Sequence, residues 1–456
     1  MLCKRESRSI RGYDEGVRTK ALIPFFLAAS LSYAEEHSLT LQQALEIASR
    51  QNPDVILARL DAQRSQENIK VVRDPFVPKV YAGSGAAYTY GYPNAINGNA
   101  PSVLDLRTDM SLFNKPQSYL LAAAREDARG VGVDVQARVD EVAFRTANLF
   151  LDAQQAVKQR ETIEGQLPSL RQALEMMQAR VTEGAELAVE VQRAKVNLTQ
   201  AQHLLQTYKS SEDYAETLLA ITLGYSANDR IYPAESQASF PLPPAKSEED
   251  SVQIAIDRSK DLKHLQSAVL AKEFEMRSYK AARLPQIGLV AQYALFAQYA
   301  YQDYFQKFQH NNYQIGASFV VPVLIGSANG GRYQQAATDV AKLRIQINQT
   351  RNRIALNTKR SYQDMKSAEE MRDLARQQLD LAHQDLSVLL SRYTEAKAPL
   401  SDVERARTIE NQRWLALYET ETQFQRARLG VLQQLGDLMA VLRLAPNGSR
   451  DQANPK

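Results

Sequence analysis

The sequence predicts a mainly helical fold that is built twice, with one pair of β-strands in each half. The segment 44–80 reappears 207 positions later, at 251–287, so that Ala48 matches Ala255. Apolar residues recur at helical spacing over long stretches of both halves. Gly- and Tyr-bearing runs of strand length stand at equivalent places in the two halves. A repeat of this size indicates that one structural unit has been duplicated.

Residues 1–34 are expected to form a signal peptide that is cleaved from the mature protein. Arg18 and Lys20 precede an apolar run over 21–31, and the segment 32–34, Ser-Tyr-Ala, has the small residues of a cleavage site. The apolar run is too short to cross a bilayer as a helix. No later window approaches 18 uninterrupted apolar residues, so we expect no transmembrane helix in the mature chain.

The mature chain is expected to carry no net charge and no cysteine. Six of the 55 Lys and Arg residues and three of the 52 acidic residues lie in the leader, which leaves 49 of each. This balance argues against nucleic acid as a partner. The only cysteine, Cys3, also lies in the leader, so we expect no disulfide, thiolate nucleophile or Cys metal site.

The sequence lacks the motifs of common enzymes and cofactor sites. Its five histidines show no metal-ligand spacing, and no G-x-S-x-G, P-loop or G-x-G-x-x-G pattern occurs. We therefore expect no catalytic residue, no cofactor and no metal site.

The first structural repeat is expected over 35–224. Val131, Val135, Val139 and Val142 keep the three-and-four spacing of a helix seam. The two strands are separated by a stretch with Pro, Asn and Gly, which predicts a loop. The expected elements are, in order, helix 38–73, strands at about 80–91 and 103–113, and helices 116–182 and 187–222.

The long helix 116–182 would span about 100 Å, and the two shorter helices of its half would match it end to end. Gly165 and Pro168 interrupt it, so we expect a kink or break there. Its apolar seam is narrow and is flanked by Gln, Arg and Ala. Such a seam predicts helices that pack edge to edge in coiled-coil fashion.

A connector rich in Pro, Ser and Tyr is expected over 225–248, before a second repeat over 249–440. Leu379, Ala382 and Leu386 keep the same three-and-four spacing in the second half. The expected elements are, in order, helix 249–282, strands at about 287–299 and 313–323, and helices 331–393 and 401–440. The C-terminal tail is expected over 441–456, with disorder from Ala445 onward.

Two hairpins supply four strands, which are too few to close a barrel. Because lipid offers no partner for an open sheet edge, strands of this chain in a membrane have to be completed by further copies. Two copies would give eight strands and three would give twelve, and geometry alone leaves both open. The alternative is a soluble sheet, in a periplasmic coiled-coil protein with a structural or adaptor-like role.

The predicted strand 103–113 bears on this choice. Leu104, Leu106 and Met110 alternate with polar residues such as Asp105 and Arg107. This alternation fits a membrane strand with its apolar side toward lipid and its polar side toward a lumen.

Local features accompany this order of elements. They are a helix with Ala44-Leu45 and Asn52-Pro53, a proline before a strand at Pro78 and Pro285, and paired turns at 180–184 and 392–396. With the duplicated order of helix, hairpin, long helix, turn and helix, they resemble the TolC family of outer-membrane efflux proteins. The resemblance covers about 40–440.

The resemblance implies a homotrimer. Its strands would form a single twelve-stranded transmembrane β-barrel in the outer membrane of a Gram-negative bacterium. Its helices would continue this barrel as an α-helical barrel through the periplasm. The chain would be the passive channel subunit of a tripartite efflux or type I secretion system. Its partners would be outer-membrane lipid, a periplasmic adaptor (membrane fusion) protein and an inner-membrane transporter, while the substrate class stays open among drugs, metals and polypeptides.

The resemblance also implies where the adaptor binds. The turns between paired helices would lie at the periplasmic tip, although ordinary turns between helices are an alternative interpretation. Gly184 keeps the family's usual glycine, whereas Ala396 departs from it. The candidate adaptor contacts are Glu183, Gly184, Ala185, Glu395, Ala396 and Lys397.

Asp402, Arg405 and Tyr393 form a candidate aperture gate. Asp402 matches the acidic position that lines the closed aperture in this family, and the family's second acidic site falls on Arg405. We therefore expect Arg405 to pair with Asp402 or with the neighbouring protomer. In the alternative interpretation, Ser401 and Glu404 form a capping box, and Asp402 only complements the helix dipole.

Overall fold

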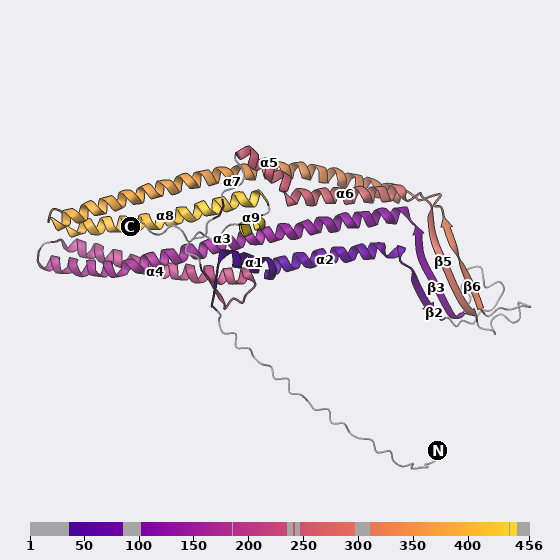
Figure 1. Cartoon of the computed structure of the whole chain (residues 1–456), viewed down its shortest axis with the longest axis horizontal. Coiled ribbons are helices and arrows are strands. Elements are labelled where there is room, and N and C mark those ends of the chain that lie inside the picture. The colour runs from indigo at the N-terminus through magenta and orange to yellow at the C-terminus, as the bar shows by residue number, and fades with distance from the viewer. Residues whose placement is uncertain are drawn as a thin grey trace, which may run out of the picture.

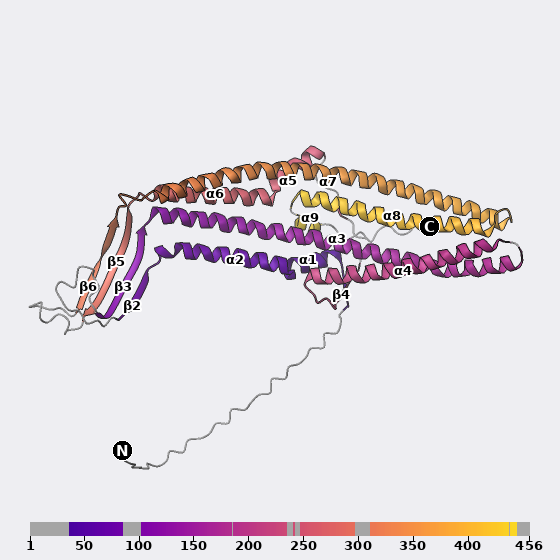
Figure 2. The same cartoon turned by 180° about the vertical axis from the view of Figure 1, so that it is seen from behind.

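The computed structural model of the protein is elongated, with a β-sheet at one end and long helices over the rest of its length (Figure 1, and from behind in Figure 2). The helices run along the long axis of the molecule. The structure describes residues 36–84, 102–184, 186–234, 240–241, 247–296, 311–436 and 438–444. The predicted signal peptide lies outside these residues.

Both halves contain a broken helix, a pair of strands, a long helix and a shorter helix, in this order. The first half has β1 (Glu36–Leu39), α1 (Leu41–Gln51), α2 (Pro53–Arg73), the 3-10 turn η1 (Asp74–Phe76), β2 (Lys79–Gly83), β3 (Ser102–Phe113), α3 (Lys115–Thr182), α4 (Ala188–Leu223) and β4 (Arg230–Pro233). The second half has α5 (Glu248–Arg258), α6 (Lys260–Ala281), β5 (Gln286–Phe296), β6 (Asn311–Val320), α7 (Ala328–Thr394), α8 (Leu400–Gln434) and α9 (Leu438–Leu444).

The helix expected over 38–73 is two helices, preceded by the strand β1. Asn52 ends α1, and its side-chain oxygen accepts a hydrogen bond from the Asp54 N–H at 2.9 Å, which caps α2. Pro53 follows, and a proline disfavours the helical conformation of the residue before it. The single-helix prediction was wrong because a capping side chain and a proline interrupt the apolar pattern.

The second half repeats this break where one helix was expected over 249–282. Ser259 ends α5, and its hydroxyl accepts a hydrogen bond from the Leu262 N–H at 3.2 Å. The capping residue differs between the halves, but its function is the same.

The long helix α3 runs from Lys115 to Thr182 without a break at Pro168. The expected break is therefore wrong, and a kink there stays a prediction. A proline removes one backbone donor from a helix, but Ile163 and Leu167 are buried in a cluster with Ala201 of α4 at this level. Burial of these side chains holds the helix together across the proline.

The described strands of the two halves join into one antiparallel sheet, in the order β2-β3-β5-β6. The central pair connects the halves, with Arg107 of β3 opposite Gln292 of β5. Residues 85–101 and 297–310, where the predicted loops and the far ends of two predicted strands fall, lie outside the described residues. β6 ends at Val320, earlier than expected, because Pro322 has no N–H to donate to a ladder.

The helices form a row that continues the sheet. Next to the sheet the order across the row is α2-α3-α6-α7, and at the far end it is α4-α3-α8-α7. The long helices α3 and α7 belong to both parts. One edge of the row is therefore made by α2 and α4, and the other by α7. None of the described helices is both long enough and apolar enough to cross a membrane.

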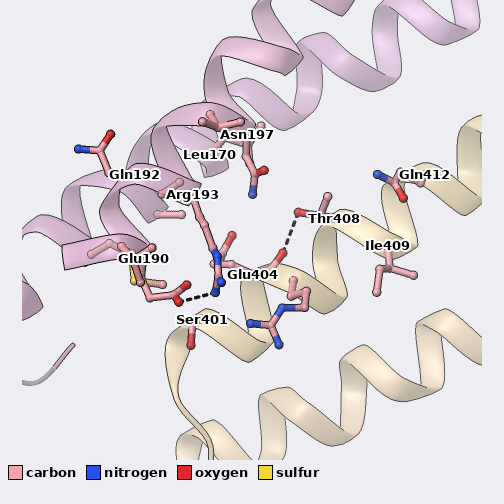
Figure 3. Close-up of a pocket in the computed structure, with 16 residues that line it drawn as sticks. Leu170, Glu190, Gln192, Arg193, Asn197, Ser401, Glu404, Thr408, Ile409 and Gln412 are labelled. Carbon is pink, nitrogen blue, oxygen red and sulfur yellow. Dashed lines mark hydrogen bonds and ion pairs between the residues drawn. The ribbon is translucent and has the colours of Figure 1, made fainter. Parts of the chain in front are cut away.

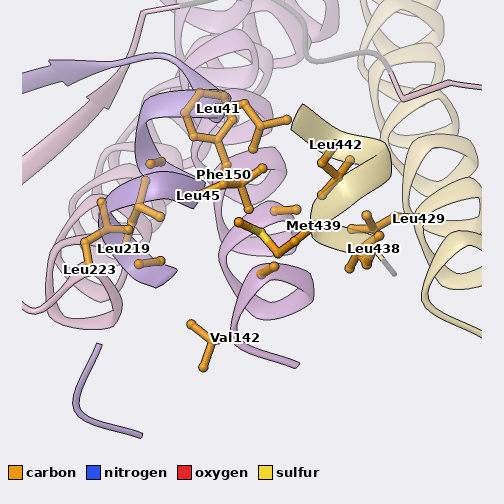
Figure 4. Close-up of a cluster of buried hydrophobic side chains, with 14 of the residues drawn as sticks. Leu41, Leu45, Val142, Phe150, Leu219, Leu223, Leu429, Leu438, Met439 and Leu442 are labelled. Carbon is orange, nitrogen blue, oxygen red and sulfur yellow. The ribbon is translucent and has the colours of Figure 1, made fainter. Parts of the chain in front are cut away.

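The largest cluster of buried apolar side chains lies at mid-length, where α1, α4 and α9 meet α3 (Figure 4). Phe150 of α3 is fully buried there, together with Leu45, Leu219 and Leu438. The two-stranded parallel sheet of β1 and β4 lies beside this cluster. Half of the other sixteen buried positions of α3 are alanines, as expected of narrow helix seams.

Candidate functional site

The hairpins α3–α4 and α7–α8 end at the pole of the molecule opposite the sheet (Figure 1). The two predicted tip turns therefore share one end of the structure. Their described residues are all exposed, namely Glu183, Gly184, Glu395, Ala396 and Lys397. Ala185 lies outside the described residues.

Ala396 adopts the left-handed backbone conformation that the first tip gives to a glycine. Its φ is 58°, and that of Gly184 is 74°. The Ala396 N–H donates to the Tyr393 carbonyl at 2.9 Å, and the Lys397 N–H donates to the Arg392 carbonyl at 2.8 Å. These two bonds close a helix in the Schellman manner. The departure from glycine therefore leaves the conformation of the turn intact.

Ala396→Gly is expected to raise the free energy of unfolding by about 1 kcal/mol, because the alanine Cβ disfavours the left-handed conformation. Chemical denaturation of the detergent-solubilised protein, followed by helical circular dichroism, measures this change. Ala398→Gly, two residues further on, is the control and should lower stability, since it only adds freedom to the unfolded chain. A loss of stability in Ala396→Gly would contradict the assignment.

The two tips are joined by a contact between Arg180 of α3 and Tyr393 of α7, which we call the tip clasp. The Arg180 guanidinium carbon lies 5.5 Å from the centre of the Tyr393 ring, within the range of a cation–π interaction. Arg180 Nη1 also lies 3.8 Å from Glu186 Oε1, beyond the turn. Tyr393 packs against a small apolar cluster of Leu386, Val403 and Ala406.

Tyr393 was predicted as a gate residue, and Arg180 was not. The repeat places Arg180 on Arg392 at an offset of 212, and this match marks a position without naming its partner. The only signal in the sequence was that both arginines precede a tip turn.

Asp402 and Arg405 pair with each other within one chain. Arg405 Nη1 lies 3.2 Å from Asp402 Oδ1, and both side chains are substantially exposed. The helix α8 begins at Leu400 with Pro399 as its N-cap, so Ser401 lies inside the first turn. The capping box of Ser401 and Glu404 is therefore wrong. The pair repeats Glu190 and Arg193 of α4, which are joined at 2.5 Å.

A cleft of about 500 Å³ lies between the two hairpins near their tips (Figure 3). Its polar lining includes Glu190 and Arg193 from α4 and Glu404 and Arg405 from α8. Burial raises the pKa of Glu404, and Arg407, at 2.9 Å, opposes this rise. The apolar lining consists of Leu170, Ala173, Met177, Val189, Ala194, Val196 and Ile409.

The sheet has one polar face and one apolar face, as the pairing register shows. Arg107 lies opposite Tyr81 and Gln292 and therefore shares their face. The polar face carries Lys79, Asp105, Arg107, Asp109, Ser111, Gln292, Asn312, Gln314 and Ser318. The apolar face carries Val80, Leu106, Met110, Ile287, Leu289, Leu295, Ile315 and Phe319.

The apolar face is open in the isolated chain. Ile315 is 78% exposed and Phe319 is 65% exposed. Among the described residues, no α-helix lies over either face of the sheet (Figure 1). An uncovered apolar surface of this kind marks a site of contact with a membrane or a partner.

Comparison with known families identifies the chain. The model of a family described as "Outer membrane efflux protein" matches residues 41–224 and 251–437. The two stretches together cover most of the sequence. The chain belongs to the outer membrane efflux protein family. As a member of this family, the protein resides in the outer membrane of a Gram-negative bacterium and extends into the periplasm.

Solved structures of low sequence identity share the fold of this efflux protein. CusC, from a study of its folding and transmembrane channel formation, gives a TM-score of 0.72 at 15% identity over 87% of this chain and 92% of that chain. The outer membrane protein VceC of Vibrio cholerae gives 0.71 at 16% identity, over 87% and 96%. The CmeC outer membrane channel of Campylobacter jejuni gives 0.71 at 15% identity, over 87% and 85%. By sequence, none of the curated proteins matches the chain.

In the described part of this efflux protein, no group of three or more His, Cys, Asp or Glu residues is placed to hold a metal ion. The charged groups at the tips are instead arranged as acid–base pairs, such as Asp402 with Arg405 and Glu190 with Arg193. Each pair lies within one helix, three residues apart, and exposed pairs of this kind contribute little to stability.

Proposed function

We propose that three copies of this chain form one channel through the outer membrane, which is the passive exit duct of a tripartite efflux or type I secretion system. The proposal rests on two features of the four-stranded sheet. Its apolar face is uncovered, and its edge strands β2 and β6 each have one neighbour among the described strands. Neighbouring copies would supply the missing strand at each edge, and a closed ring would leave no edge in lipid.

The polar face supports the choice of three copies. Eight strands enclose an interior that side chains fill, whereas twelve strands leave space for solutes. With three copies, the side chains of Arg107, Asp109 and Gln292 line a wet lumen, and the apolar face meets lipid. No catalytic step is needed for passage through such a duct.

The edges of the helix row support the same assembly. α2 exposes Leu57 and Leu60 at one edge, and α7 exposes Ile345 and Leu356 at the other. Two different edges that each expose apolar side chains suit a head-to-tail contact, and such contacts form a ring where the rotation between copies closes. The helices of three copies would then continue the barrel into the periplasm.

The alternative of a soluble periplasmic coiled-coil protein needs a cover for the apolar face. Ile315 and Phe319 have none among the described residues. In water, a face of this size leads to aggregation, which natural sheets avoid. The exposed face therefore favours the membrane channel over a structural or adaptor-like protein.

Reconstitution into planar lipid bilayers tests the proposed function. The purified protein is expected to migrate as a heat-modifiable trimer and to give discrete ion-conducting openings. A protein that leaves the cells without detergent and shows no conductance would overturn the channel.

We also assign the aperture to the helical tips, with the periplasmic adaptor docking at the two exposed turns. The tip clasp ties hairpin α7–α8 to hairpin α3–α4, so a movement between the hairpins has to break it. The Asp402–Arg405 pair lies one turn along α8 on the same pole. In a ring, three copies of these charges surround one axis.

Tyr393→Leu and Arg180→Met are each expected to raise the open probability of the reconstituted channel about fivefold or more. Each removes a contact of about 1 kcal/mol from the closed state, while the leucine keeps the packing against the apolar cluster. Arg171→Met is the matched control, because Arg171 is an exposed arginine on the same helix without an ion pair among the described residues. If all three variants have the same open probability, the tip clasp does not stabilise the closed channel.

A further inference from the structure

The loop between β6 and α7, residues 321–327, presents two unusually exposed apolar side chains. Leu324 is 94% exposed and Val323 is 88% exposed. They are the two most exposed of the large hydrophobic residues in the described part of the chain. The loop and its flanks, Val-Val-Pro-Val-Leu-Ile-Gly-Ser over 320–327, contain no charged residue.

The chain does not need this loop to pass from strand to helix. In the first half, β3 ends at Phe113 and α3 begins at Lys115, so a single residue, Asn114, makes the same connection. In the second half, seven residues stand between the end of β6 and the start of α7. The additional residues are mostly apolar, and water surrounds them in the isolated chain.

The loop is continuous with the apolar face of the sheet. β6 contributes Ile315 and Phe319 to this face, and the loop begins directly after β6. It lies at the level where strands give way to helices (Figure 1). If the sheet spans the membrane, this level is the surface of the leaflet that faces the periplasm.

Basic residues gather at the same level. Arg73 is the last residue of α2, Lys280 and Arg283 lie at the end of α6, and Arg332 lies in the second turn of α7. All four residues are exposed, and none of them forms an ion pair within the described residues. The acid nearest to them in sequence, Asp74, is already paired with Lys79.

We propose that this junction is an anchor for anionic phospholipid in the periplasmic leaflet. Val323 and Leu324 insert at the boundary of headgroups and acyl chains, and Arg73, Lys280, Arg283 and Arg332 bind headgroup phosphates. Apolar insertion and basic side chains are the two signals that together hold a segment at a membrane surface. The inference rests on the proposed function, since it takes the sheet as the membrane-spanning part.

A second copy is the other occupant that the loop could meet, because β6 is an edge strand. The central junction of the chain shows what such a contact requires. There the end of β3 lies beside the start of β5, with Phe113 opposite Ile287, and the one-residue connection of the first half suffices. Contact between neighbouring junctions therefore explains neither the length of the loop nor the unpaired basic residues.

Site-directed fluorescence quenching tests the apolar part of the anchor. Leu324→Cys, Ile315→Cys and Lys397→Cys are each introduced with Cys3→Ser into the full chain, labelled with an environment-sensitive dye, and reconstituted in phosphatidylethanolamine–phosphatidylglycerol vesicles. A nitroxide on the lipid chain near the headgroup is expected to quench the dye at Leu324 and Ile315. Iodide in water should quench only the dye at Lys397, on the distant tip.

Each other outcome is informative. Iodide quenching at Leu324 with lipid quenching at Ile315 would overturn the anchor and leave the channel standing. Protection of Leu324 from both quenchers would show that a second copy covers the loop, and would overturn the anchor too. Iodide quenching at Ile315 would overturn the membrane-spanning sheet itself, and the anchor with it.

The basic part is tested by lipid preference. Spin-labelled phosphatidylglycerol is expected to associate with the protein roughly fivefold more strongly than spin-labelled phosphatidylcholine. Joint substitution of Arg73, Lys280, Arg283 and Arg332 by Gln should abolish this preference. The control substitutes Gln for four other exposed basic residues of α7, Lys342, Arg351, Arg360 and Lys366, and should retain it. An unchanged preference in the junction variant would overturn the headgroup site.

Discussion

Gly224→Ala is expected to lower the free energy of unfolding by roughly 3 kcal/mol. Gly224 ends α4 with a φ of 92°, where any other residue is strained. A Cβ at this position would lie 2.8 Å from the carbonyl oxygen of Gln51 and 3.3 Å from its carbonyl carbon. Both atoms belong to the backbone, so no side-chain rotation relieves the clash. The end of α1 has to move away from α4.

The surroundings make such a movement unfavourable. Asn52, next to Gln51, donates a buried hydrogen bond from its side chain to the Thr222 carbonyl at 2.7 Å. Leu219 and Leu223 of α4 belong to the mid-length cluster, together with Leu45 of α1. A shift of either helix therefore opens the largest apolar core of the molecule.

Two other glycines serve as matched controls. Gly184 has a φ of 74°, and no atom lies within 4 Å of the place that a Cβ would take, so Gly184→Ala should cost about 1 kcal/mol from backbone strain alone. Gly436, with a φ of 75°, would place its Cβ 3.3 Å from the Arg258 Cβ and should fall between the two. Chemical denaturation of the three variants in detergent measures the order. Equal losses of stability at Gly184 and Gly224 would show that the contact with Gln51 does not destabilise the Gly224 variant.

Much of this fold follows from the repeat in the sequence. A duplicated unit predicts equivalent elements in the two halves, and both tip turns have the same conformation although Ala396 replaces a glycine. Helix ends were harder to predict. Asn52 and Ser259 cap new helices inside a continuous apolar pattern, because a single side-chain hydrogen bond decides the break.

The candidate site was predictable in position and not in contacts. The turns and the Asp402–Arg405 pair are local in sequence, so spacing along the chain indicates them. The tip clasp joins Arg180 to Tyr393, which are distant in sequence. The residue pattern of one half does not predict which residue of the other half it contacts. The loop after Val320 was assigned in part to a strand, since apolar residues there match a strand pattern.

Glu216 is a buried carboxyl group that the apolar spacing of its helix did not predict. It lies on α4 and is only 1% exposed, and its Oε1 atom has no hydrogen-bond partner in the structure. Two arginines are near enough to act on it, but each is held by another acid. Arg160 of α3 pairs with Glu212 at 2.6 Å, and Arg230 of β4 pairs with Asp213.

These surroundings raise the pKa of Glu216 to about 7. Burial is the main cause, because the charged form loses its hydration, and the charges of Glu212 and Asp213 add to it. Arg230 and Arg160 oppose the rise only in part. Since the folded pKa is above the unfolded value, the folded state holds the proton more tightly. The protonated Glu216 therefore stabilises the folded state fully below about pH 4.5, and this stabilisation is lost as the pH rises to about 7.

Glu216→Gln should therefore remove a pH dependence that the native chain shows. Between about pH 4.5 and 7 the native protein is expected to lose about 3 kcal/mol of stability relative to the variant, so that the variant is the more stable at pH 8. Urea denaturation in detergent at a series of pH values gives this difference. Glu67→Gln, at an exposed residue of α2, is the control and should follow the native protein.

Glu212→Gln separates the causes of this pKa. It removes the negative charge beside Glu216 and leaves Arg160 paired only with Glu161 and Glu164 of its own helix. The loss of stability should move to lower pH and become smaller, although burial of Glu216 is unchanged. If Glu212→Gln leaves the pH profile unaltered, burial alone sets the pKa. If Glu216→Gln leaves it unaltered, Glu216 is not the group that titrates.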